Sequence, residues 1–334
     1  MIALFVLAAL LACGLLFQIA GDYFDARRYA PPGQRIAVPG GANLHVYSQG
    51  SLVTPTVVFE AGISGSCLSW TTVQPLVAEF ARSVAYDRAG LGWSRGSLTP
   101  RTVANMVAEL AAVLDSAQIS SPYVLVGHSF GCLLIQAFSH TYPDRTAALV
   151  MVDPVTLAGW ANADARQLRR LSTGARLCRR GALLARFGVV RAALSLLIAG
   201  GTRIPKLVAR ASAGQGNSVI EQLISEVRKL PLEAQRIVAA NWSRARSFLA
   251  MATYLECLPP SARTALNMPV PAEIPLYILS AANATKTELA ERAAWVAARK
   301  NAHHTQVEGT GHWLQLERPE LVTDVVREAA LRVR

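Results

Sequence analysis

The segment GHSFG at residues 127–131 constrains the fold more than any other part of the chain. The apolar run Tyr123–Gly127 before it predicts a buried strand, and the residues from Cys132 onward predict a helix. The turn between them must be sharp, so small residues are needed on both sides of Ser129. Such a turn raises a serine hydroxyl above the sheet, beside a helix N-terminus whose amides stabilise negative charge. Ser129 is therefore our candidate nucleophile.

Short apolar runs alternate with helical patterns along most of the chain, which indicates βαβ units and a mostly parallel, doubly wound α/β sheet. Residues 155–272 break the alternation, with long helical patterns and no convincing strand. We therefore predict a core of residues 37–154 and 273–334, and a helical cap at 155–272 over the carboxyl ends of the strands. The expected strands are Asn43–Ser48, Thr56–Glu60, Ser83–Asp87, Tyr123–Gly127, Ala147–Val152, Pro275–Ser280 and His304–Glu308, and the expected helices are Val103–Ser116, Cys132–Tyr142, Thr287–Lys300 and Pro319–Leu331.

The net charge of +11 is confined to one part of the chain. Residues 155–270 contain 17 Lys and Arg against 5 Asp and Glu, so the remaining residues are close to neutral. The basic residues are interleaved with Leu, Ile and Val, as in Leu183–Ala199, and no nucleic-acid-binding motif accompanies them. We expect no nucleic-acid partner. An anionic membrane surface is one interpretation of the basic segment, and a solvated helical face is the other.

The N-terminal residues 1–20 contain no charged residue, and 18 of them are apolar, with Gly14 and Gln18 as the exceptions. About 20 such residues cross the hydrocarbon core of a bilayer. Arg27 and Arg28 follow as interfacial anchors. We predict a single-pass membrane anchor at residues 1–28. A cleaved signal peptide is the competing interpretation, disfavoured because the first residues lack Lys and Arg. The side of the membrane is left open.

A serine hydroxyl needs a general base, and His312 is our candidate. It follows the last predicted strand in the sequence GTGHW, whose glycines suit a loop that brings an imidazole to the sheet edge. An oxyanion needs amide donors. We expect them from Phe130, the residue after Ser129, and from Ile63 in the glycine-containing loop of residues 60–65.

Two further features are interpreted as structural. Residues 86–94 (YDRAGLGWS) follow a predicted strand, and Asp87 is placed to organise this loop by accepting backbone hydrogen bonds. The five cysteines are odd in number and irregularly spaced, without a CxxC pair. They predict neither a disulfide framework nor a metal site.

The ordered motifs FEAGISG, YDRAGLGWS, GHSFG, LVMVDP and GTGHWLQLERPE resemble the α/β-hydrolase superfamily, within it the lipase, esterase and dehalogenase-like branch that carries a cap. The resemblance covers residues 37–334 apart from the cap, and implies that an acid orients His312. In the family this acid usually follows the strand after the cap, where residues 280–285 (SAANAT) offer no carboxylate. Our choice is Asp153, one strand earlier, with Glu288 in reserve and Asn283 as an uncharged substitute.

The expected activity is acyl transfer to water from a carboxylic ester, through Ser129, His312 and Asp153, with no metal or organic cofactor. The cap is rich in Leu, Ala and Val, which favours substrates that are apolar on at least one side. Lipid-derived esters are a hypothesis that rests on the membrane anchor and the basic apolar cap. Dehalogenase and epoxide hydrolase chemistry is disfavoured, because those relatives use Asp at the Ser129 position. Thioesterase, peptidase and C–C hydrolase activities stay open. A catalytically silent, membrane-bound binding module is the alternative from another class.

Overall fold

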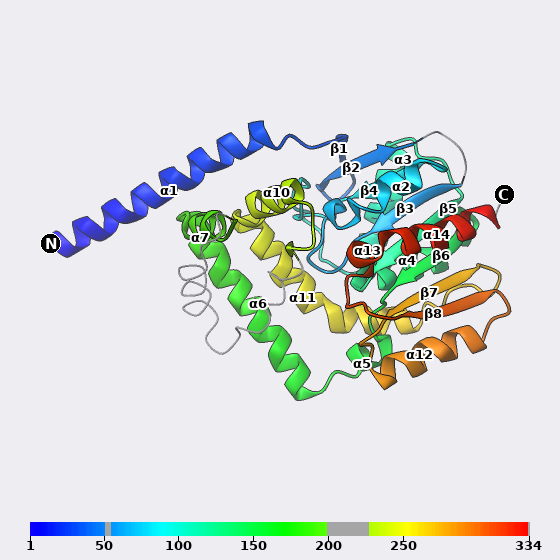
Figure 1. Ribbon diagram of the computed structural model, residues 1–334. Helices are drawn as coiled ribbons and strands as arrows, with labels where there is room; N and C mark the ends of the chain where they lie inside the picture. Colours follow the sequence, from blue (N-terminus) through cyan, green and yellow to red (C-terminus); the bar gives the residue numbers. More distant parts are fainter. Residues whose placement is uncertain (51–54, 199–226, 333–334) are drawn as a thin grey trace.

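The computed structural model describes residues 1–50, 55–198 and 227–332. Its centre is an eight-stranded sheet with the order β1-β2-β4-β3-β5-β6-β7-β8 (Figure 1). The strands from β3 onward run parallel, and β1 and β2 pair antiparallel at one edge. The strands are β1 (Gln34–Ala37), β2 (Asn43–Gln49), β3 (Thr56–Glu60), β4 (Ser83–Tyr86), β5 (Tyr123–His128), β6 (Thr146–Val152), β7 (Leu276–Ala281) and β8 (Ala302–Val307).

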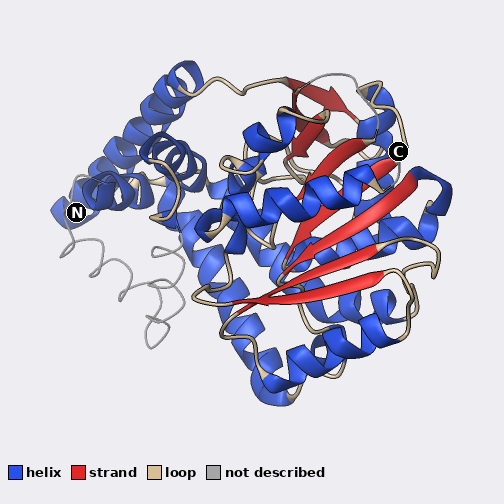
Figure 2. Ribbon diagram, turned by 45° about the vertical axis from the view of Figure 1, so that its right-hand side comes forward, coloured by secondary structure: helices blue, strands red, loops and turns tan. Residues whose placement is uncertain are grey.

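Helices cover both faces of this sheet (Figure 2). The central strands β3, β5, β6 and β7 are buried on both faces, as expected for parallel strands with near-continuous apolar sequences. One apolar cluster joins α3 and α4 to the sheet, and a second joins α2 and α14 to the opposite face. The core helices are α2 (Gln74–Ala78), α3 (Val103–Ser116), α4 (Phe130–Thr141), α12 (Lys286–Ala297), α13 (Leu314–Glu317) and α14 (Pro319–Leu331), with short 3₁₀ helices at Cys67–Trp70 and Pro143–Arg145.

The helices between β6 and β7 gather at one side of the sheet (Figure 1). Here α11 packs along α6 and over α5, and its buried Tyr254 donates a hydrogen bond to the carbonyl of Ala89 in the core, at 3.1 Å. These helices are α5 (Leu157–Ala161), α6 (Ala165–Arg186), α7 (Val189–Ile198), α10 (Leu232–Trp242) and α11 (Ala245–Leu266). Residues 199–226 of the predicted cap lie outside the described residues.

The α/β class and every predicted strand and helix are confirmed, with ends that shift by at most three residues. Three short core elements, β1, α2 and α13, and the two 3₁₀ helices were not predicted. The edge strand β1 has four residues, and α2 has five, too few for either to show a clear hydrophobic period.

The N-terminal segment forms one helix, α1 (Ile2–Arg28), which projects from the body of the molecule (Figure 1). Its mean hydropathy of 2.6 over 18 residues and its length are sufficient to cross a membrane, and a signal sequence has the same properties. The linker after α1 is fixed to the core. The indole N–H of Trp93 donates to the Tyr29 carbonyl at 2.9 Å, and the His45 ring donates to the Pro32 carbonyl.

Candidate active site

Ser129 stands on a strained turn at the carboxyl end of β5. Its backbone has φ 54° and ψ −117°, in the left-handed half of conformational space that a residue with a Cβ rarely occupies. The turn is possible because glycines stand two residues before and two residues after Ser129. A Cβ at Gly127 would lie 2.8 Å from the Cys132 nitrogen, and one at Gly131 would lie 2.5 Å from the Glu60 carbonyl oxygen. The local sequence therefore dictates the position of the serine.

His312 and Asp153 meet at the same edge of the sheet, although 159 residues separate them in the chain. The Nδ1 of His312 donates to Oδ2 of Asp153 at 2.6 Å, a short distance typical of a charge-assisted hydrogen bond. Asp153 follows β6 and itself has a positive φ of 46°. Its amide donates to the Leu279 carbonyl at 2.7 Å, which fixes the backbone beside β7. The imidazole is partly exposed, whereas the carboxylate is largely buried.

The other Asp153 oxygen is held by Arg292, a buried residue of α12. Nη1 of Arg292 donates to Oδ1 at 2.9 Å, and the amide of Ala281 donates to the same oxygen at 3.1 Å. Burial alone would raise the pKa of the Asp153 carboxyl, but His312, Arg292 and the Ala281 amide together lower this pKa below its usual value. The carboxylate is therefore ionised near neutral pH.

His128 supports the loop that carries His312. Its ring is buried, and Nε2 donates to the His312 carbonyl oxygen at 2.7 Å. The ring of His128 also contacts the rings of His312 and Trp313, with centroids 4.7 and 5.1 Å away. Burial, followed by the proximity of His312, lowers the pKa of His128 to about 3, so this ring is neutral at physiological pH.

The loop after β3 is shaped by Arg88, whose importance was not predicted. Its guanidinium is buried, pairs with Glu60 at 2.7 Å, and donates to three successive carbonyls of the loop, those of residues 61–63. Because these carbonyls point toward Arg88, the amides of the same peptide groups point away from it. Gly62 borders the serine, since a Cβ added there would lie 3.7 Å from the Ser129 Cβ. The sequence signal for Arg88 was its place directly after β4 in YDRAG.

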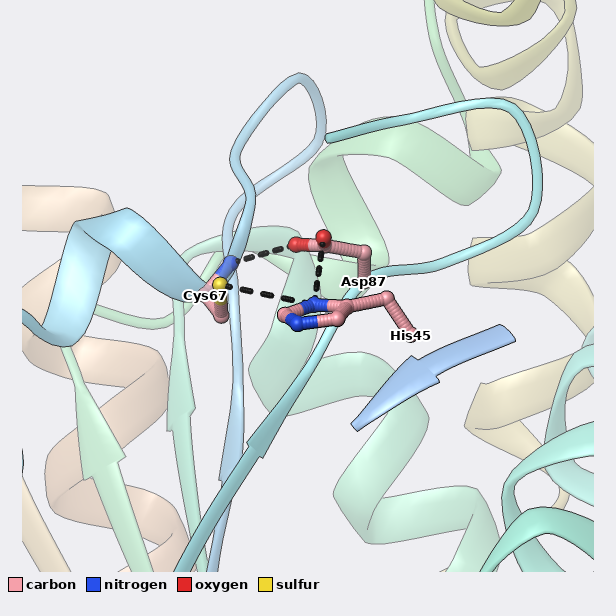
Figure 3. Close-up of side chains that lie close together, drawn as sticks. All are labelled: His45, Cys67 and Asp87. Carbon is pink, nitrogen blue, oxygen red and sulfur yellow. Dashed lines mark hydrogen bonds and ion pairs between the residues drawn. The ribbon is translucent and has the colours of Figure 1, made fainter. Parts of the chain in front are cut away.

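Asp87, next to Arg88, organises its surroundings by the backbone hydrogen bonds expected from its position. Its carboxylate accepts from the amides of Cys67 and Trp93, at 2.7 and 2.9 Å, and from the His45 ring at 2.9 Å (Figure 3). His45, Cys67 and Asp87 form the group with metal-ligand spacing that was found in the described ranges. Both carboxylate oxygens and both ring nitrogens of His45 already have hydrogen-bond partners, so this donor set fits a buried structural network better than a metal ion.

A contact between core and cap lies beside the histidine loop. Glu317 of α13 accepts a hydrogen bond from the amide of Gly311 at 2.6 Å, and its other oxygen pairs with Lys229 at 2.5 Å. A small cavity opens next to this loop, between residues 64–69 and α10. Its apolar lining comes from Leu68, Val227, Leu230, Val238, Trp242 and Trp313.

The structure thus brings Asp153 to His312 and places neither of the two alternatives, Glu288 and Asn283, there. Glu288 lies in the first turn of α12, where its carboxylate accepts from the Thr285 amide at 2.7 Å and closes a capping box. Asn283 is exposed in the loop before that helix. Ser129 and His312 are both described, and no hydrogen bond joins their side chains.

Comparison with known proteins identifies the family of the chain. A model of the alpha/beta hydrolase family matches residues 57–325, so the chain belongs to this family. It is similar to an AB hydrolase superfamily protein of Gibberella zeae, 32% identical over 97 residues, which are 29% of this chain and 30% of that protein. The chain spans less than half the length of the curated relatives it matches.

Solved structures show the same fold. The haloalkane dehalogenase DbeA from Bradyrhizobium elkani has a TM-score of 0.64 at 18% identity, over 90% of this chain and 97% of that one. A thermophilic esterase from Thermogutta terrifontis has a TM-score of 0.57 at 21% identity, over 90% of this chain and 99% of that one. At these identities the likeness establishes the fold, and the chemistry depends on the residues of the site.

Proposed function

We propose that the protein is a serine hydrolase that cleaves carboxylic esters through Ser129, His312 and Asp153. The observation that carries this proposal is the 2.6 Å contact between Asp153 and the Nδ1 of His312, at the sheet edge where Ser129 stands on its strained turn. Because Nδ1–H donates to the carboxylate, the other ring nitrogen, Nε2, is the one left to accept a proton.

The reaction begins when the Ser129 hydroxyl attacks the ester carbonyl and its proton passes to Nε2 of His312. The tetrahedral oxyanion is stabilised by the amides of Phe130 and Ile63. Phe130 suits this role because it is the first residue of α4, so its N–H has no acceptor within the helix. The imidazolium then protonates the leaving alcohol, and a water molecule, deprotonated by His312, releases the acid from Ser129. No metal or cofactor enters these steps.

The described residues show no hydrogen bond between the side chains of Ser129 and His312. In enzymes of this kind such contacts are often long in the free state and shorten when substrate is bound. The supports described above restrict the remaining movement. Arg292 holds the acid, His128 holds the histidine backbone, and Arg88 holds the oxyanion loop.

The substrate proposed is an ester with an apolar group, and lipid-derived esters are the class we favour. The small cavity beside Trp313 supports this, because apolar side chains of residues 68, 227, 230, 238 and 242 line it. The proposed location is a membrane, with α1 as a single-pass anchor, which would give the enzyme direct access to such esters.

Labelling with a fluorophosphonate probe tests the catalytic proposal, in detergent and in lipid vesicles. We expect the full-length protein to be labelled, Ser129→Ala not to be labelled, and Asp153→Asn to be labelled much more slowly. Ser120→Ala, an exposed serine outside the site, is the matched control and should label like wild type. A wild-type protein that stays unlabelled under both conditions would overturn the proposal and favour a catalytically silent binding module.

Hydrolysis of ester series with increasing acyl length tests the substrate class separately. A preference for long acyl chains is expected. A preference for short, water-soluble esters would refute the lipid assignment and leave the serine mechanism intact. Thioesters and amides in the same assay distinguish the thioesterase and peptidase alternatives.

A further inference from the structure

One face of α1 differs from the rest of that helix. Gly14, Gln18, Asp22 and Asp25 are partly or fully buried, whereas most residues around them are exposed. Their spacing of four, four and three residues places them on a single side of the helix. Gln18 donates to Asp22 within α1 at 3.0 Å. The two carboxylates at the edge of an apolar layer remain costly without a counter-charge, so this face requires a protein partner.

The corner between α6 and α7 provides that partner, and both views show α1 running beside it (Figures 1 and 2). A Cβ added at Gly14 would lie 2.5 Å from the carbonyl oxygen of Phe187. Gly188, with φ +72°, approaches equally closely, since a Cβ there would lie 2.5 Å from the Phe17 ring. Glycines on both sides let the two backbones pack tightly, as at helix contacts in membranes.

Arg191 of α7 satisfies the polar part of the α1 face. Its guanidinium is buried and lies 2.7 Å from Asp22, 2.5 Å from Asp25 and 3.3 Å from the side-chain oxygen of Gln18. Arg244 adds a weaker contact to Asp22 at 3.4 Å. A planar guanidinium that binds several oxygens fixes both distance and orientation. Thus α1 is clamped to the helical region and does not act as a loose tether.

This contact sets the depth of the α6–α7 corner relative to a membrane. Gly14 lies six residues before the end of the uncharged segment 1–20, which corresponds to about 9 Å along the helix axis. With that segment in the hydrocarbon core, Phe187 and Gly188 lie inside the apolar layer too. The helices α6 and α7 bend by 92° at this corner.

The exposed surfaces at the corner match the acyl-chain region and the headgroup region of a bilayer. On α7, Val189, Ala192 and Leu196 are exposed and share one apolar face. On the outer face of α6, six arginines are exposed and have no counterpart of opposite charge in an ion pair among the described residues. An apolar face next to a row of guanidiniums suits acyl chains next to anionic headgroups. These arginines are Arg166, Arg169, Arg170, Arg176, Arg180 and Arg186.

We propose that the α6–α7 corner enters an anionic phospholipid bilayer beside α1, with the α7 face among the acyl chains and the α6 arginines at the headgroups. Arg191 is the clamp that holds the corner at this depth. This inference rests on the membrane span proposed for α1 and deepens it, since the helical region above the site becomes a second membrane contact.

Depth-dependent fluorescence quenching tests the proposal in the full-length protein. An environment-sensitive fluorophore is attached at Leu196→Cys, in vesicles of phosphatidylcholine and phosphatidylglycerol with brominated acyl chains. Leu331→Cys, at an exposed leucine that ends α14, is the matched control. Helix α14 lies on the opposite side of the molecule from α7 (Figure 1). The more accessible native cysteines, Cys13, Cys178 and Cys257, are replaced by alanine in both proteins.

We expect the label at position 196 to lose about half its fluorescence or more, and the label at position 331 to be unaffected. Replacing phosphatidylglycerol by phosphatidylcholine should weaken the quenching at position 196, because the α6 arginines lose their counter-charge. Equal fluorescence at both positions, in protein that floats with the vesicles, would overturn the inference and leave the α1 anchor standing. A second protein copy or another protein would then be the occupant to seek.

A substitution of Arg191 tests the clamp separately. Arg191→Gln should reduce the quenching at position 196, whereas Arg327→Gln, at an exposed arginine of α14 outside the proposed membrane contact, should preserve it. Unchanged quenching in Arg191→Gln would exclude the clamp. Fluorophosphonate labelling of the same samples reports on the catalytic proposal alone, so a failure of one proposal is distinguishable from a failure of the other.

Discussion

Arg292 and Arg191 are both buried arginines that hold carboxylates, and their surroundings differ. Arg292 binds Asp153, which also accepts hydrogen bonds from His312 and from the Ala281 amide. Arg191 binds Asp22 and Asp25, which belong to a different segment of the chain and are more exposed than Asp153. The sheet edge that holds Asp153 is therefore fixed by several independent contacts, and the contact of α1 relies mainly on one guanidinium. The comparison shows that several groups fix Asp153, the expected acid, whereas mainly one side chain joins α1 to α7.

The largest effect should come from the acid itself. Asp153→Asn keeps the shape of the side chain but removes the charge that selects the Nδ1–H form of His312. We expect kcat for ester hydrolysis to fall by about 10⁴-fold. Glu288→Gln is the matched control and should retain activity, because its partner is the N-cap of α12. A large loss in Glu288→Gln together with a small loss in Asp153→Asn would reverse our assignment.

A smaller effect is expected at Arg292. In Arg292→Met the carboxylate keeps its other partners, so we expect kcat to fall by about 10²-fold or less. The acidic limb of the kcat/KM profile should also move to higher pH, because Arg292 is one of the groups that lower the pKa of the Asp153 carboxyl. Arg292→Lys should restore part of the rate. A lower rate with an unchanged pH profile would mean that Arg292 only stabilises the fold.

Arg191→Gln tests the other half of the comparison. Removing the guanidinium leaves two carboxylates beside an apolar helix pair, and we expect the free energy of unfolding in detergent to fall by about 2 kcal/mol, less than for a fully buried pair because Asp22 is partly exposed. Denaturant titration measures this, with Arg186→Gln as control. Equal stabilities would show that Arg244 and glycine packing suffice for the contact.

A further effect concerns pH. His128 has a pKa of about 3 in the folded protein, against about 6.5 when unfolded. Below pH 6.5 the unfolded chain therefore binds one more proton, and stability falls as the pH falls, by about 1.4 kcal/mol per pH unit from this group. Urea titrations between pH 6 and pH 4 should show a shallower decline in His128→Asn. Parallel curves for the two proteins would contradict this assignment.

The sequence predicted the framework well because its signals are local. A buried strand, a glycine-flanked serine and a late histidine each appear within a few consecutive residues, and their order predicts which strand ends they occupy. Arg292 was missed because nothing near it in the sequence indicates that α12 places it against β6. Arg88 stood in a segment already interpreted as support, yet its grip on the loop of residues 61–63 depends on packing.

The sequence contains a signal for the α1 contact. Gly14 and Gln18 were the two exceptions in an otherwise apolar segment, and Asp22 follows at the same spacing of four. Residues four apart share one side of a helix, so these exceptions already outlined a face. What the sequence could not supply was the partner, because Arg191 lies about 170 residues further along the chain.

The fixed linker after α1 has a kinetic consequence. Hydrogen bonds from Trp93 and His45 to the carbonyls of Tyr29 and Pro32 restrict the rotation of the core relative to α1 that a short loop would otherwise allow. With α1 in a bilayer, the enzyme would meet its substrates by lateral diffusion in two dimensions, always in the same orientation. Its turnover would then follow the mole fraction of substrate in the surface and not the bulk concentration, so dilution with inert lipid would slow it while dilution with buffer would not.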